Sequence, residues 1–290
     1  MIAKRRLRSD AAAALLFLAP SGIGFALFYL IPFAMAVYDS FINGAASNRF
    51  VGLENYRELL ISGSFRKAAS NTFYFTMISV PPMVGLSLGL ALLMNRDLFA
   101  RNGLRTAYVL PLVVPVASVV FVWQMLLDWN GSLNAWLGHL GIARVDWMKT
   151  DTARYAIAAV SLWKNIGYNM IIFLAGLQQI PKDYYETARM EGAGRFRQFR
   201  SITLVYVTPT MFLVVIMSII NSFKVFREAY LIAGDYPHDS IYMLQHYMNN
   251  MFMSMDIQKL TAAAALMAGC MLLLTLGLFA LERRFRQFID

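Results

Sequence analysis

Six long apolar stretches separated by polar segments dominate the pattern of the chain. A helix needs roughly 20 apolar residues to cross a bilayer core of about 30 Å, and each stretch is about that long. No segment alternates with the two-residue period of a barrel strand, so the sequence predicts an all-α membrane protein with six transmembrane helices. We expect one domain over residues 1–290, with spans at about 11–38, 70–94, 105–127, 153–178, 203–222 and 260–281.

The composition supports a membrane protein and argues against a nucleic-acid-binding one. Hydrophobic residues make up 58% of the chain and charged residues 15%, against about 45–50% and 25% in soluble domains. The net charge of +9 comes from basic residues in short segments between the apolar stretches. Such segments are typical of a protein held at an anionic membrane surface. The lipid bilayer is therefore an expected partner, and nucleic acid is not.

The lysines and arginines gather on one side of the predicted topology. They concentrate at the N-terminus, after the second and fourth spans, and at the C-terminus, whereas acids balance bases on the opposite side. Because basic residues favour the cytoplasmic side, both termini and the segment 179–202 are predicted to be cytoplasmic. The outer segments 39–69, 128–152 and 223–259 are then candidates for contact with another protein or for anchoring at the membrane interface.

The cytoplasmic segment 179–202 has the pattern of two short helices joined by a tight turn. Pro181 stands where a helix begins, and Asp183 and Glu186 favour the positive end of its dipole. Gly192 and Gly194 then supply a stop and a turn. The following residues place aromatic and apolar side chains on one side of a second helix: Phe196, Phe199 and Ile202. The pattern predicts either an elbow that docks into a groove on a partner or an ordinary amphipathic loop.

The spacing in this segment resembles the EAA loop of ATP-binding-cassette (ABC) importer permeases. The matching residues are Glu186, Ala188, Gly192, Ile202 and Leu204. Thr187 replaces the middle alanine of the motif, and Val205 stands where proline is usual. The resemblance extends over nearly the whole chain and is to the carbohydrate branch, the maltose and multiple-sugar type. One departure is 234–237, where that branch often has Gly-Gly-Pro.

The resemblance implies a type I ABC importer permease fold in the plasma (inner) membrane of a prokaryote. It implies three protein partners: a second homologous permease subunit in a heterodimer, a cytoplasmic ATPase dimer that holds ATP and magnesium, and an external solute-binding protein. No cofactor is expected on this chain. The residues expected to couple it to the ATPase are Glu186, Thr187, Ala188, Glu191, Gly192, Ala193, Phe196 and Phe199.

The fourth span carries the clearest candidates for the translocation path. Lys164, Asn165, Tyr168 and Asn169 share one helix face, Trp163 flanks it, and Asn221 of the fifth span is close enough in the pattern to join. Amides and aromatic rings suit a sugar or oligosaccharide, whereas Lys164 would suit glycerol 3-phosphate or another anionic polyol. The alternative is that these polar groups only hold helices together.

Other classes of function find less support. The chain has no Gly-x-x-x-x-Gly-Lys-Ser/Thr loop for ATP, and its one cysteine, Cys270, lies in an apolar stretch. The three histidines, His139, His238 and His246, fall in outer segments and are expected at the surface. An ion-coupled secondary transporter would carry acids inside its spans, but every acid lies in a predicted loop or at a span end. The sequence therefore predicts neither a catalytic nor a metal site.

Overall fold

The computed structural model describes residues 2–43, 49–96 and 99–286. The chain divides into two compact units, Met1–Ser62 with Met251–Gly269, and Gly63–Asn250 with Cys270–Asp290. Within these described residues, five helical segments are long and apolar enough to cross a membrane, or six when one bent pair is counted as a span. The structure is thus mostly helical, as expected from the apolar pattern.

In the first unit, a continuous helical run leads into a small capping structure. The run consists of α1 (Ile2–Phe25), the π-helical turn η1 (Ala26–Leu30) and α2 (Ile31–Asp39). A two-stranded antiparallel pair, β1 (Ile42–Asn43) and β2 (Arg49–Phe50), precedes α3 (Glu54–Ile61). The buried Asn55 of α3 donates hydrogen bonds to the carbonyl oxygens of Ser40 and Ile42, at 2.9 and 3.1 Å. This amide therefore fixes α3 to the end of α2.

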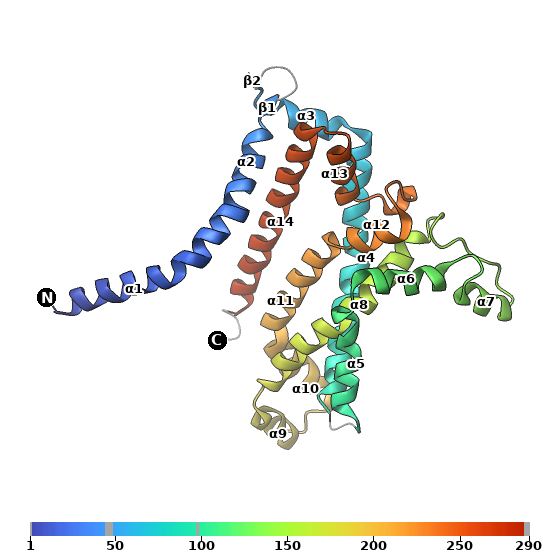
Figure 1. Cartoon of the computed structure of the whole chain (residues 1–290). Coiled ribbons are helices and arrows are strands. Elements are labelled where there is room, and N and C mark those ends of the chain that lie inside the picture. Colours follow the sequence, from blue (N-terminus) through green and yellow to red (C-terminus); the bar gives the residue numbers. More distant parts are fainter. Residues whose placement is uncertain (1, 44–48, 97–98, 287–290) are drawn as a thin grey trace. The chain divides into compact units, whose positions relative to one another are not determined.

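The second unit contains a group of three packed helices with shorter elements at both ends (Figure 1). The packed helices are α4 (Gly63–Met94), α8 (Ala153–Gln178) and α11 (Leu204–Phe223). At one end lie α9 (Lys182–Met190), α10 (Arg195–Gln198) and η2 (Phe199–Thr203); towards the other lie α12 (Phe226–Ala233), η3 (Asp239–Ile241) and α13 (Leu244–Met253). The helix α14 (Ile257–Arg286) begins in the first unit and ends in the second.

Glycines allow the helices of the second unit to approach each other closely. A Cβ atom on Gly167 of α8 would lie 1.8 Å from the carbonyl oxygen of Tyr108 in α5 (Arg101–Val113). A Cβ atom on Gly176 would lie 2.4 Å from Oγ1 of Thr210 in α11. Small residues at such crossings are the common means of packing helices in lipid, where the hydrophobic effect between helices is weak.

The third expected span differs from a single helix over 105–127. The chain instead forms α5 and α6 (Val116–Leu127), and the segments on either side of the break are bent by 98°. The break falls at Val114 and Pro115, both of which have extended backbone angles. The proline ring disfavours a helical conformation at the residue before it, which explains why the helix ends there. The short helix α7 (Ser132–His139) follows α6.

The expectation that all three histidines lie at the surface is wrong for His246. This residue of α13 is only 1% exposed. Its Nδ1 faces the Met243 N–H at 3.4 Å, and its ring meets Phe226 edge-on at 4.7 Å. Burial lowers the pKa of His246 to about 4, so the ring is neutral at neutral pH. The cause is the docking of α13, where the Leu244 N–H donates to Thr72 Oγ1 of α4 at 2.9 Å.

The close crossing of α8 and α5 makes a first prediction. Replacing Gly167 by alanine forces the two backbones apart, and overpacking of this kind costs about 1–3 kcal/mol. The variant Gly167→Ala is therefore expected to lower the melting temperature of the purified protein in detergent. The matched control is Gly89→Ala in α4, where a Cβ would meet nothing within 4 Å. An unchanged melting temperature for Gly167→Ala would show that the crossing is not tight.

Candidate functional site

The segment between α8 and α11 forms an elbow with two arms, α9 on one side and α10 with η2 on the other. The turn between the arms is a regular helix C-cap. Gly192 follows α9 with a positive φ of 78°. Its N–H donates to the Arg189 carbonyl at 3.0 Å, and the Ala193 N–H donates to the Ala188 carbonyl at 2.8 Å. These two bonds form a Schellman motif, which needs a left-handed residue that glycine adopts without a steric penalty. The turn is therefore a defined structure, as the glycine pattern predicted.

Side chains hold the two arms of the elbow together from within. The Gln198 amide donates to the Ala193 carbonyl oxygen at 2.7 Å, and Gln198 is buried. The Tyr185 hydroxyl lies 3.0 Å from Oγ1 of Thr203, a residue of η2. The first bond ties the second arm to the turn, and the second bond joins the two arms, so the arms are held at a defined angle.

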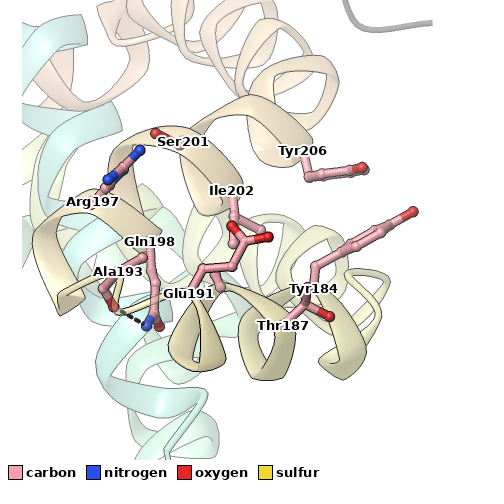
Figure 2. A pocket seen from close by; sticks show the side chains of 10 residues that line it. Tyr184, Thr187, Glu191, Ala193, Arg197, Gln198, Ser201, Ile202 and Tyr206 are labelled. Atoms are coloured by element: carbon pink, nitrogen blue, oxygen red, sulfur yellow. Dashed lines mark hydrogen bonds between the residues drawn. The ribbon is translucent and has the colours of Figure 1, made fainter.

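A cavity of about 640 Å³ lies on the inner side of the elbow. The rings of Tyr184 and Tyr206 stack at one end of it, with centroids 5.1 Å apart, and Glu191 reaches toward its middle (Figure 2). It is lined by Tyr184, Thr187, Ala188, Glu191, Ala193, Arg197, Gln198, Ser201, Ile202 and Tyr206. Aromatic, acidic and basic groups thus share one concave surface.

The residues expected to couple this chain to an ATPase divide between the inner and outer sides of the elbow. Those that line the cavity are Thr187, Ala188, Glu191 and Ala193. Glu186 and Phe196 are exposed and do not line it, and Phe199 is half-buried. Sequence reasoning missed Gln198 and the two stacked tyrosines. The only signal for Gln198 was an uncharged amide within a run of arginines.

The polar face of α8 is dispersed among several environments. Asn169 is fully buried, and its amide donates to Oγ of Ser218 in α11 at 2.9 Å. The amide of Asn165 donates to the Ser161 carbonyl oxygen within α8 at 2.8 Å. Trp163 is exposed, with its ring edge-on to that of Trp123, and Tyr168 is half-buried. Asn169 therefore joins α8 to α11, whereas the side chains of these neighbours on α8 remain at least partly exposed.

Lys164 forms an ion pair with Glu228 of α12. The two side chains are only 14% and 7% exposed. Glu228 lies near the end of the apolar helical segment Arg195–Ala233, in the expected outer segment 223–259, but it is buried, which the sequence did not indicate. A charged lysine at this depth requires a counter-charge, which Glu228 of α12 supplies.

A second cavity, of about 150 Å³, surrounds this ion pair. Its walls come from α8, from α11 and α12 with the turn between them, and from one residue of α5. The lining residues are Leu112, Ser161, Lys164, Asn165, Asn221, Lys224, Val225, Arg227 and Glu228. Of the residues proposed for the translocation path, the structure brings Lys164, Asn165 and Asn221 together here. Trp163, Tyr168 and Asn169 are not among the lining residues.

Among the residues that the structure describes, no three His, Cys, Asp or Glu side chains form a group that could hold an ion.

The buried ion pair makes a second prediction. Removing one partner of such a pair leaves an uncompensated buried charge, which costs about 3–5 kcal/mol, whereas replacing both is often nearly neutral. Lys164→Met and Glu228→Leu are each expected to lower the melting temperature in detergent, and the double variant is expected to recover most of the loss. Additive losses in the double variant would show that the two side chains are not coupled.

Comparison with known proteins identifies the family. The model of the family described as "Binding-protein-dependent transport system inner membrane component" matches residues 82–288. The sulfoquinovosyl glycerol transport permease SmoG of Agrobacterium fabrum is 31% identical over 268 residues, covering 89% of this chain and 86% of that protein. The trehalose/maltose transport permease MalF of Thermococcus litoralis is 34% identical over 190 residues, covering 65% and 64%.

A solved structure has the same fold. It is a bacterial alginate ABC transporter in complex with an alginate pentasaccharide-bound periplasmic protein, and one of its chains superposes with a TM-score of 0.80. The match covers 97% of this chain and 96% of that one, at 22% identity. Fold and family thus confirm the resemblance found in the EAA loop. The chain belongs to the binding-protein-dependent transport system inner membrane components, the multi-pass permease subunits of ABC importers.

Proposed function

We propose that this chain forms half of the translocation path for a sugar or oligosaccharide that an external binding protein delivers. The observation that carries the proposal is the small cavity at α8, α11 and α12, into which Asn165 and Asn221 face. Asparagine amides both donate and accept hydrogen bonds, as sugar hydroxyls do. The cargoes named for the similar proteins, sulfoquinovosyl glycerol, trehalose or maltose, and alginate, are all saccharides or glycosides.

The ion pair removes Lys164 itself as the group that would bind an anionic polyol. A free lysine would suit glycerol 3-phosphate, but the charge of Lys164 is already compensated by Glu228. Trp163, Tyr168 and Asn169 remain in the proposal only as neighbours of the path, because the cavity is lined by other residues.

We further infer that the elbow is where an ATPase dimer, carrying ATP and magnesium, acts on this chain. The Schellman turn and the Gln198 bond support a stiff elbow, and Glu186, Thr187 and Phe196 are exposed on it. A rigid elbow can transmit a closing motion of a partner as a rotation of α8 and α11. The basic residues of 182–200 support a cytoplasmic elbow, with both termini on that side and a second homologous permease subunit completing the path.

The experiment uses the complete transporter, purified with its partner subunits and reconstituted in liposomes. The variants Glu186→Ala and Phe196→Ala remove exposed side chains of the elbow without touching the bonds that close it. We expect less ATPase subunit to copurify and ATP-dependent saccharide uptake to fall at least tenfold, a loss of about 1.4 kcal/mol or more in coupling. The second permease subunit should still copurify.

Arg96→Ala serves as the matched control, because Arg96 is exposed just after α4 and lies outside the elbow. It should leave copurification and uptake unchanged. Full ATPase binding and uptake in both elbow variants would contradict the coupling role. Failure of the unmodified transporter to take up any saccharide would contradict the cargo.

A further inference from the structure

The cavity around the Lys164–Glu228 pair carries more positive charge than Glu228 alone can compensate. Three of its lining residues are cationic, and one is anionic. Lys164 and Glu228 compensate each other. Lys224 and Arg227 are exposed, and neither side chain forms an ion pair or hydrogen bond with any residue that the structure describes. The cavity therefore keeps two uncompensated positive charges.

These two cations lie at the rim of a cavity whose floor is deep and polar. Ser161 and Lys164 are about 12 and 17 Å along α8 from its start at Ala153, at about 1.5 Å per residue. Lys224 directly follows α11, and Arg227 lies in the first turn of α12. In a cleft with low-dielectric walls, the field of such cations is focused inward and attracts anions.

The size of the cavity limits what it can hold. At about 150 Å³ it has less than a quarter of the volume of the cavity at the elbow, which is about 640 Å³. It therefore suits one substituent of a sugar better than a whole oligosaccharide. The amides of Asn165 and Asn221 and the hydroxyl of Ser161 line it beside the cations, so hydrogen-bonding groups and positive charges meet in one small space.

We propose that this cavity is a subsite for the acidic group of an anionic saccharide, such as a uronic acid or a sulfonated sugar. Lys224 and Arg227 pair with the carboxylate or sulfonate, and Asn165 and Asn221 bind ring hydroxyls. The guanidinium of Arg227 suits this task because it donates two parallel hydrogen bonds to an oxyanion. The inference rests on the proposed function, since it assumes that the path carries a saccharide, and adds that the cargo is charged.

A lipid phosphate has the same charge but fits the cavity less well. A phosphate group alone would pair with Lys224 and Arg227 and leave the hydroxyl of Ser161 and the amide of Asn165 without a ligand. A sugar that carries an acidic group pairs with the cations at the rim and also forms hydrogen bonds with the polar groups of the floor. The experiment therefore also compares an anionic lipid with a neutral one.

The test measures thermal stabilisation of the complete transporter by defined glycosides, because a ligand that binds the folded state raises the melting temperature. The probes are a glucuronate-containing disaccharide, a sulfoquinovose glycoside, and the disaccharide with its carboxyl group reduced to an alcohol. We expect the acidic probes to give the same shift as the neutral one at a concentration at least tenfold lower. The advantage should shrink as salt screens the charges.

Variants then assign the charge effect to the rim. The double variant Lys224→Gln/Arg227→Gln should remove the advantage of the acidic probes and leave the response to the neutral sugar unchanged. Lys149→Gln, which removes an exposed lysine outside the cavity, should change neither response.

Each other outcome overturns the inference in a distinguishable way. Equal stabilisation by acidic and neutral sugars would refute the acidic subsite and leave the saccharide path standing. Stabilisation by no saccharide at all would refute the proposed function as well. Stabilisation by phosphatidylglycerol over phosphatidylcholine, with no sugar preference and the same dependence on Lys224 and Arg227, would make the cavity a lipid site.

Discussion

The structure depends on one constraint: polar groups at the depth of the bilayer must find their partners inside the protein. Three side-chain pairs meet this need between helices of the second unit: Asn169 with Ser218, Thr76 with Ser222, and Lys164 with Glu228. They join α8 to α11, α4 to α11, and α8 to α12. Together with the close crossing of α8 and α11 at Gly176, these pairs link α4, α8, α11 and α12. In the proposed importer these four helices move as one body.

In the proposed importer, the elbow acts through these links. It leaves the end of α8 and returns as α11, so both of its arms continue into helices that are tied to each other. Its own geometry is held by Gly192 and Gln198, which leaves the exposed side chains Glu186 and Phe196 free for a partner. In the proposed importer, a displacement at the elbow moves α8 and α11 as a unit, and α12 follows because Glu228 is paired with Lys164. The cavity around the Lys164–Glu228 pair, which lies away from the elbow, then becomes more or less accessible to the cargo.

Local patterns in the sequence predicted most elements, because apolar length and glycine spacing are local signals. The expected span 153–178 coincides with α8, and the two-helix elbow is present with Gly192 at its turn. The burial of Glu228 and His246 was not predictable, since each depends on packing against residues far along the chain. The break at Pro115 had a local signal, but prolines inside spans are often tolerated, so the sequence alone did not decide it. The unpaired state of Lys224 and Arg227 likewise emerges only from the fold.

The central claim is that the elbow and the packed helices move as one body. A distance measurement between spin labels tests it most directly, after replacement of the exposed Cys270. Labels at Arg189 in α9 and at Lys149 before α8 are both exposed, and the whole of α8 lies between them in the chain. In the complete transporter, the distance between them should stay the same with and without ATP, while the distance from Arg189 to a label on the second permease subunit changes. An ATP-dependent change between Arg189 and Lys149 would contradict the account.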